Sequence, residues 1–196
     1  MADLPIELDA ALTGRLARAL DVEAKIPRAF EALGPVADRD VLLVDGLADG
    51  IRATQLRDGG ARVAVGTVRD ASAASADVVV GCWTAFRGPD LEEVAEAARV
   101  LRPGGRLLVL YDYGRDDVSR LRGDLPEYGL WSRRDGPYLR GGFKVRVLHC
   151  FWTFDSIEEG RTFLEDAFGE IGGVVGAGMV RPRLSYNVAV YHRTFE

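Results

Sequence analysis

The sequence is poor in the side chains that most often carry metal, redox or lysine chemistry. Its 196 residues include two cysteines, two histidines and two lysines, against 23 arginines. Two cysteines cannot form a disulfide framework or a four-cysteine zinc site, and no HExxH or CxxC spacing is present. We therefore expect no metal centre. The simplest interpretation of Cys82 and Cys150 is that they are small apolar core residues.

Long apolar segments are also absent. No run of 18 apolar residues exists, as a membrane helix would need, and the opening MADLPIE lacks the pattern of a secretory signal. The net charge of −5 and the pI of about 5.2 weigh against a nucleic-acid partner, because such proteins usually carry a basic surface. These features predict a soluble, cytoplasmic protein that contacts neither membranes nor nucleic acids.

The composition is that of an ordinary folded domain. Apolar residues make up 47% and charged residues 28%, and a chain of this length can fold without a disulfide or a metal. We expect one domain over residues 1–196. Its expected parts are helices over 1–34, an α/β core over 40–111, a lid or loop over 112–142, and a closing strand–helix–strand unit over 143–196.

Two amphipathic helices are predicted at the start of the chain. Leucines recur every four residues over 6–20, which places them on one helix face. Apolar residues continue at helical spacing over 22–33, where Pro27 predicts a kink or a restart. Gly34-Pro35 ends the second helix.

Short apolar segments then alternate with helical ones. The run Val41–Val44 is continuously apolar, which predicts a strand covered on both faces. It is followed by a turn over 45–50, a helix over 51–57, a strand over 61–66, a small polar segment over 67–76, a strand over 77–83, a helix over 90–101 and a strand over 106–111. This alternation with short connections is typical of a parallel α/β sheet.

The last third of the chain changes in character. Residues 112–142 are polar and rich in glycine, which predicts a loop or lid. A strand is expected over 144–154, and Ser156 and Glu159 have the spacing of a capping box for a helix that stops at Gly169. We expect a loop over 172–184 and a final strand over 185–192.

The stretch LRPGGRLLV at 101–109, directly after an amphipathic helix, is the most specific pattern in the sequence. Together with the order of elements it resembles the class I S-adenosylmethionine-dependent methyltransferases over roughly residues 22–193. The resemblance implies a Rossmann-like three-layer α/β sandwich with a mostly parallel sheet and an antiparallel last strand. It also implies S-adenosylmethionine as cofactor and methyl transfer to a small-molecule substrate.

The resemblance places the cofactor at the carboxyl ends of the strands. There, a glycine-rich turn admits the ligand, a helix N-terminus faces its carboxylate, and an acidic residue after the second strand binds its ribose. The residues so implied are Asp45, Gly46, Ala48, Gly50, Gly66, Thr67, Asp70, Cys82 and Trp83. The implied substrate pocket is lined by Phe86, Asp112, Tyr113 and His149.

Several of these positions have a second interpretation. Trp83 and Phe86 either shape the pocket or belong to the core, and Asp112 either faces the pocket or belongs to a salt-bridged loop. His149 is either a general base or a structural residue on its strand. No catalytic residue is assigned.

The sequence departs from the family pattern in the glycine-rich turn and after the second strand. Ala48 stands where the middle glycine belongs, and Gly66-Thr67 stands where the acidic residue belongs. Asp70 either substitutes for that acid or belongs to the next element. These departures favour a second hypothesis, in which the chain is a degenerate, non-catalytic methyltransferase-like domain that acts through protein association.

The spacing of the strands predicts a shortened sheet. Only 36 residues separate Val41 from Asp77, whereas the family places three strand-to-strand connections there and one βαβ unit takes roughly 30 residues. We therefore expect the third strand and a flanking helix to be missing or vestigial. The strand left at that edge would be unpaired, which favours formation of a homodimer.

A third hypothesis comes from the segment between Asp45 and Val63, which also resembles the opening of an NAD(P)-binding short-chain dehydrogenase. Those enzymes use a Tyr-x-x-x-Lys pair. The residue four before Lys25 is Asp21, and the residue four before Lys144 is Arg140. Without such a pair, the dehydrogenase is the least favoured of the three hypotheses.

Overall fold

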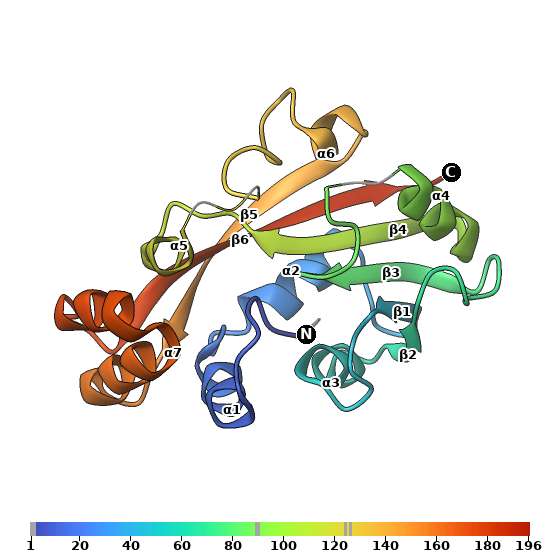
Figure 1. Cartoon of the computed structure of the whole chain (residues 1–196). Coiled ribbons are helices and arrows are strands. Elements are labelled where there is room, and N and C mark those ends of the chain that lie inside the picture. The colour runs from blue at the N-terminus through green and yellow to red at the C-terminus, as the bar shows by residue number, and fades with distance from the viewer. Residues whose placement is uncertain (1–2, 89–90, 124, 126) are drawn as a thin grey trace.

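The computed structural model describes residues 3–88, 91–123, 125 and 127–196. They contain a six-stranded sheet in the order β2-β1-β3-β4-β6-β5 (Figure 1). The strands are β1 (Asp40–Val44), β2 (Arg62–Gly66), β3 (Ala76–Cys82), β4 (Leu101–Asp112), β5 (Lys144–Thr153) and β6 (Arg183–Thr194). The first four run parallel, whereas β6 is antiparallel to both β4 and β5. The predicted α/β fold with an antiparallel last strand is confirmed.

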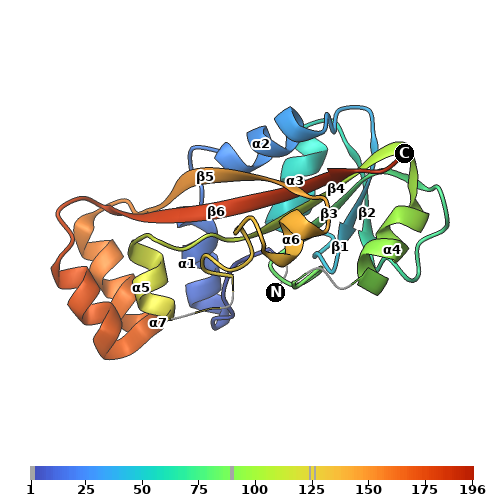
Figure 2. The ribbon, with the colours of Figure 1, turned by 90° about the horizontal axis from the view of Figure 1, so that it is seen from above.

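Helices cover both faces of the sheet. They are α1 (Ala10–Ala19), α2 (Lys25–Leu33), α3 (Ile51–Asp58), α4 (Leu91–Val100), α5 (Asp117–Arg122), α6 (Pro137–Arg140) and α7 (Ile157–Ala177). In Figure 2, α2 and α3 lie on one side of the sheet and α4 and α6 on the other, which gives the three layers expected. Among the described residues, no helix is long and apolar enough to cross a membrane.

The core follows the continuously apolar strands. Val41–Val44 of β1 and Leu107–Leu110 of β4 are buried throughout, as expected for strands with helices on both faces. In contrast, β2 has exposed side chains at Arg62 and Ala64, and Val63 is only half-buried. This strand is therefore an edge of the sheet.

The predicted loss of the third strand is confirmed for the described part of the chain. Residues 67–75, hereafter the crossover segment, lead directly from β2 to β3 and form neither a strand nor a helix. The segment is too short to hold a crossover helix, which normally requires a dozen residues or more. As a result, β2 is the outermost strand, and β1 lies between β2 and β3.

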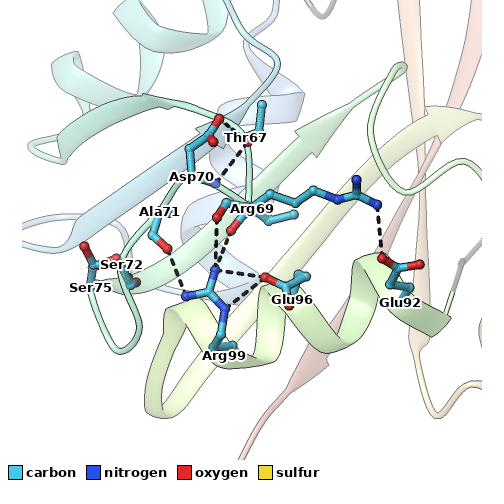
Figure 3. Close-up of polar contacts among 10 residues, drawn as sticks. Thr67, Arg69, Asp70, Ala71, Ser72, Ser75, Glu92, Glu96 and Arg99 are labelled. Atoms are coloured by element: carbon cyan, nitrogen blue, oxygen red, sulfur yellow. Dashed lines mark hydrogen bonds and ion pairs between the residues drawn. The ribbon is translucent and has the colours of Figure 1, made fainter.

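Arg99 of α4 holds the crossover segment in place (Figure 3). Its guanidinium donates to the carbonyl oxygens of Val68 at 2.9 Å and Ala71 at 3.0 Å, and it forms an ion pair with Glu96 at 2.9 Å. Because the crossover segment forms neither a helix nor a strand, these backbone carbonyls lack the partners that such an element would supply. One arginine side chain satisfies them instead.

Several predicted boundaries were wrong near the start of the chain. The first helix begins at Ala10 rather than at residue 6, because the Asp9 side chain caps it by accepting the Leu12 N–H at 2.9 Å. At Pro27 the predicted restart is confirmed and the kink is not: a new helix begins at Lys25, and Pro27 lies in its first turn, where its missing N–H removes no helical bond. Residue 90, the predicted start of the next amphipathic helix, lies outside the described residues.

The last third contains more helix than predicted. The expected loop over 112–142 includes α5 and α6, and the expected loop over 172–184 is helical as far as Ala177. Gly169 does interrupt α7, with φ of 60°, but the helix resumes after it. At its start, Glu159 accepts the N–H of Asp155 instead of that of Ser156, so the capping box is shifted by one residue.

Candidate functional site

The strands align so that their carboxyl ends meet at one edge of the sheet. Val44 of β1 lies beside Gly66 of β2 and Gly81 of β3. The arrowheads of β3 and β4 in Figure 1 point toward the part of the molecule that holds the start of the chain, α1 and α5. In open α/β sheets this edge is the usual place for a ligand.

The turn after β1 places the first group of predicted cofactor residues. Asp45 adopts a φ of 54°, and its N–H donates to the Gly66 carbonyl at 3.1 Å. A Cβ on Gly46 would lie 2.4 Å from Cδ2 of Leu43, so packing against the strand already accounts for this glycine. Ala48 is exposed, and its carbonyl accepts a 2.7 Å hydrogen bond from Arg57.

The N-terminus of α3 is occupied by a side chain from the same chain. Gly50, the N-cap residue, offers no capping side chain. A Cβ there would lie 1.7 Å from Oδ2 of Asp3, so the Asp3 carboxylate fills this space. Burial raises the pKa of Asp3, while the positive charge of Arg52 and hydrogen bonds from the Arg52 and Ile51 N–H groups act to lower it. Asp3 is only 5% exposed.

Arg52 adds a buried positive charge at the same helix end. Its side chain is 1% exposed, and its guanidinium carbon lies 5.2 Å from the ring centre of Trp83. Nη1 donates to Oε1 of Gln55 at 2.6 Å, whereas Nε has no hydrogen-bond partner among the described residues. A fully buried arginine with a free donor is costly, because the group loses water without a full set of replacements.

Trp83 connects this helix end to a second buried polar cluster. Its Nε1 donates to Oδ1 of Asp112 at 3.0 Å, and the Tyr186 hydroxyl donates to the same oxygen. Arg122 of α5 forms an ion pair with Oδ2 of Asp112. The structure therefore brings together Trp83 and Asp112, which the sequence had assigned to cofactor and substrate respectively.

Cys82 and Phe86 are both buried in the core. Burial raises the pKa of the Cys82 thiol to about 12, so the sulfur stays protonated near neutral pH. The Phe86 ring packs against Gly81, where a Cβ would lie 2.7 Å from the ring. The Phe86 carbonyl accepts the Tyr138 hydroxyl at 2.5 Å. The burial of Cys82 and the contacts of Phe86 fit the interpretation in which both belong to the core.

Gly66, Thr67 and Asp70 lie along an open groove of about 740 Å³ beside the crossover segment. The groove runs over β1 and β2. It is bordered by residues of these strands, such as Arg62, and by residues of the crossover segment, such as Ser72. Figure 3 shows Asp70 turned toward Thr67, whose hydroxyl donates to Oδ2 of Asp70 at 2.7 Å. The Asp70 carboxylate is thus engaged within its own turn.

Tyr113 and His149 both contact Asn187 of β6 rather than the residues that line this groove. The Tyr113 N–H donates to the Asn187 carbonyl at 2.9 Å, and Nδ1 of His149 lies 2.8 Å from Oδ1 of Asn187. His149 is on β5, the strand at the opposite edge from β2. The structure therefore does not bring His149 together with Gly66.

The sequence reasoning missed Asp3, Arg52, Arg122 and Tyr186. Arg52 carried a signal, since an arginine in the first turn after a glycine-rich loop is placed at the positive end of a helix, where it is disfavoured. Asp3 carried none, because it lies 47 positions before Gly50, the N-cap residue of the helix whose end it fills. Pairing over such a distance is visible only in the folded chain.

Comparisons with known proteins bear on the fold. No protein-family model matches the chain, and no curated protein matches it. Among solved structures, it is similar to a proposed type II methyltransferase from Anaeromyxobacter dehalogenans, with 20% identity, a TM-score of 0.54, and coverage of 87% of this chain and 95% of that one.

Two further solved structures are similar over most of both chains. One is a proposed methyltransferase from an antibiotic biosynthesis pathway of Anabaena variabilis, with 12% identity, a TM-score of 0.55, and coverage of 89% and 98%. The other is a proposed methyltransferase from Bacillus halodurans, with 14% identity, a TM-score of 0.53, and coverage of 87% and 99%. Identities this low establish the fold alone. The resemblance to the class I S-adenosylmethionine-dependent methyltransferases is thus confirmed as a shared architecture: the chain has a methyltransferase-like α/β fold.

Proposed function

We propose that this chain is a non-catalytic methyltransferase-like domain that associates with a second copy of itself through the edge of its sheet. The observation that carries this proposal is that the sheet ends at β2. Ending there removes the part of the fold that the family uses beside the adenine of its cofactor. It also leaves a strand without a neighbour on one side.

The carboxyl edge does not fit S-adenosylmethionine in the described conformation. The Asp3 carboxylate occupies the helix end that would face the carboxylate of the cofactor. The second strand ends in Gly66-Thr67, which offers no acidic group to the ribose, and Asp70 is bonded to Thr67. The chain therefore lacks free groups at two of the positions that recognise the cofactor.

The free side of β2 is suited to pairing with another strand. The Arg62 N–H donates to the Arg39 carbonyl, and the Gly66 carbonyl accepts the Asp45 N–H. Residues 62, 64 and 66 of β2 therefore direct their backbone groups toward β1. Alternate residues of a parallel strand bond to alternate sides, which directs the backbone groups of Val63 and Val65 outward. Arg62 is the one charged residue of β2, and it is paired with Asp40 of β1 at 2.6 Å. From Val63 to Gly66 the strand has neither a charged residue nor a proline, the usual protections of an edge.

The opposite edge of the sheet is protected. There, β5 carries exposed charged side chains at Lys144 and Arg146 and an exposed His149. Like charges placed opposite each other destabilise a strand pair, so β5 is a poor site for self-association. The contrast between the edges supports β2 as the interface. A symmetric pair of β2 strands would form a closed dimer.

Sedimentation velocity tests the association. We expect the wild type to sediment as a dimer at roughly 100 μM, and the Ala64→Lys variant as a monomer, because each dimer would then place like charges side by side on paired edges. Ala11→Lys is the matched control, since Ala11 is exposed on α1, away from β2. A monomeric wild type at this concentration would refute the proposed interface.

Calorimetric titration with S-adenosylhomocysteine tests the absence of catalysis. We expect no saturable heat with the wild type at millimolar ligand. Micromolar binding would instead support the second candidate function, methyl transfer from S-adenosylmethionine to a small molecule. The fold of the neighbouring structures favours this candidate.

A further inference from the structure

We propose that the groove between α2 and β5, hereafter the α2–β5 groove, binds the phosphate group of a small molecule. It lies at the β5 edge of the sheet, opposite β2, so the proposal is independent of the proposed self-association. In Figure 2, α2 runs beside β5, and the two elements are in contact. The groove has a volume of about 410 Å³, which suits a small ligand. It is lined by Lys25, Arg28 and Ala29 of α2 and by Arg146, Val147, Leu148 and His149 of β5.

The first observation is the charge of this lining. Three of the lining residues are cations, namely Lys25, Arg28 and Arg146, and none carries a carboxylate. The chain as a whole has a net charge of −5, so this surface differs in sign from the rest of the molecule. A concave surface with charges of one sign concentrates the field and attracts ions of the opposite sign. The α2–β5 groove therefore favours an anion.

The second observation is that the neighbouring acids do not balance these cations. Glu23 forms an ion pair with Lys25 at 2.6 Å, and its pKa is lowered by a hydrogen bond from Lys25 and by the charges of Lys25, Arg183 and Arg28. One exposed carboxylate is thus shared among several cations. The carboxylates of Asp21 and Glu31 accept backbone N–H groups instead.

The two arginines of the groove keep donors for a ligand. Arg28 donates one hydrogen bond, from Nη2 to the backbone carbonyl of Glu23 at 2.7 Å, and this acceptor carries no net charge. Arg146 is exposed, and its side chain has no ion pair or hydrogen bond within the described part of the chain. A guanidinium matches the oxygens of a phosphate with parallel hydrogen bonds.

The third observation is the free edge of β5. The Phe151 carbonyl accepts the Asp21 N–H at 3.1 Å, and the His149 carbonyl accepts a hydrogen bond from Nζ of Lys25 at 2.7 Å. The odd-numbered residues of β5 therefore direct their backbone groups away from β6. By the same alternation, the N–H groups of Val147 and His149 point outward, and both residues line the groove. Outward N–H groups at a sheet edge are donors that bind anions.

Charges next to the groove favour phosphate over an anion with a single charge. Lys144 lies directly opposite His192, and Arg146 and Arg106 lie on the same face of the sheet. The pKa of His192 is lowered by burial and by the positive charges of Lys144, Arg106 and Arg146, as expected where cations gather. A phosphomonoester carries about −1.5 to −2 charges at pH 7, so it offsets more of this repulsion than a carboxylate does.

Phenyl phosphate is the probe, and benzoate is its matched control with the same ring and a single charge. Backbone amide NMR of the wild type at constant ionic strength follows each titration. We expect the Val147 and His149 amide signals to shift saturably with phenyl phosphate, with a dissociation constant on the order of 1 mM. Benzoate should bind more weakly. The proposal is overturned if neither signal shifts saturably up to about 20 mM phenyl phosphate, or if benzoate binds equally well.

Arg146→Gln and Arg28→Gln locate the binding, and both residues are exposed, so the variants should fold. Each should weaken phenyl phosphate binding by roughly tenfold, because each removes a charged hydrogen-bond donor. Arg69→Gln removes the same charge from the crossover segment, beyond the opposite edge of the sheet, and should leave the affinity unchanged. Unchanged affinity in both groove variants would overturn the proposal, because the ligand would then bind elsewhere.

Cosedimentation with phosphatidic acid vesicles distinguishes a free phosphomonoester from a lipid headgroup, which carries the same group. We expect the wild type to remain in the supernatant. Cosedimentation that Arg146→Gln abolishes would assign the groove to a lipid surface, and the proposed small-molecule ligand would be overturned.

Discussion

Gly50→Ala is the substitution that tests the contact between Asp3 and α3 most sharply. The backbone of Gly50, with φ of −79° and ψ of 168°, is one that alanine adopts without strain. The added Cβ would, however, lie 1.7 Å from Oδ2 of Asp3 and 2.9 Å from Cβ of Leu47. Since Asp3 cannot remain in place, a single methyl group should displace its side chain from the helix end.

The expected loss of stability has two parts. Displacing Asp3 pulls on the buried Leu4, and full exposure of a leucine side chain costs about 1.5–3 kcal/mol, so partial exposure costs about 1 kcal/mol. Replacing a glycine by alanine at an N-cap position adds roughly 0.5–1 kcal/mol. We therefore expect Gly50→Ala to lower the free energy of unfolding by about 2 kcal/mol.

Urea denaturation of a double-mutant cycle measures this effect. In the Asp3→Gly background the carboxylate is absent, so Gly50→Ala should cost only the capping part, under about 1 kcal/mol. The coupling between the two positions is the difference between the two costs. Equal costs in both backgrounds would refute the contact between Asp3 and the helix end.

Three further expectations concern other parts of the molecule. Arg99→Met should lower the free energy of unfolding by about 1–2 kcal/mol and speed backbone hydrogen exchange across the crossover segment. The control Arg69→Met, at an exposed ion pair, should lower it by under about 0.5 kcal/mol. Equal exchange rates in both variants would contradict the role of Arg99. Asp112→Asn should cost about 2 kcal/mol in urea denaturation, because it leaves the partly buried Arg122 cation without its anion. A cost below about 0.5 kcal/mol would argue against that pair. Burial raises the pKa of Asp3 above 3.8, so the folded state binds this proton more tightly than the unfolded state does, and the stability that Asp3 contributes falls as the pH rises through its folded pKa. The unfolding free energy of the wild type relative to Asp3→Asn should therefore decrease from about pH 4 to about pH 7, and a flat difference would show that this pKa is not raised.

The sequence predicted the sheet because its signals are local. Val41–Val44 is apolar without interruption, and the 36 residues between Val41 and Asp77 cannot hold three connections. Both facts follow from chain length and strand burial, which require no knowledge of distant contacts. The helical residues up to Ala177 were missed, because four glycines over 172–184 suggested a loop, whereas packing in the folded chain overrides their weak helix propensity.

The candidate site was less predictable, because its contacts join distant parts of the chain. The helix end at Gly50 could be located from the glycine-rich turn, but its partner Asp3 could not. Likewise, Asp112 was identified from its place after a strand, while Arg122, with which it pairs, was hidden in a segment expected to be a loop. Tertiary proximity decided both pairings, and no periodicity in the sequence encodes it.

A crystal structure of the wild type grown with about 5 mM S-adenosylhomocysteine would test the central claim most directly. We predict that the Asp3 carboxylate lies against the N–H groups of Ile51 and Arg52, with no nucleoside at the ends of β1 and β2. The contradicting result would be the carboxylate of S-adenosylhomocysteine at the start of α3, with Asp3 displaced.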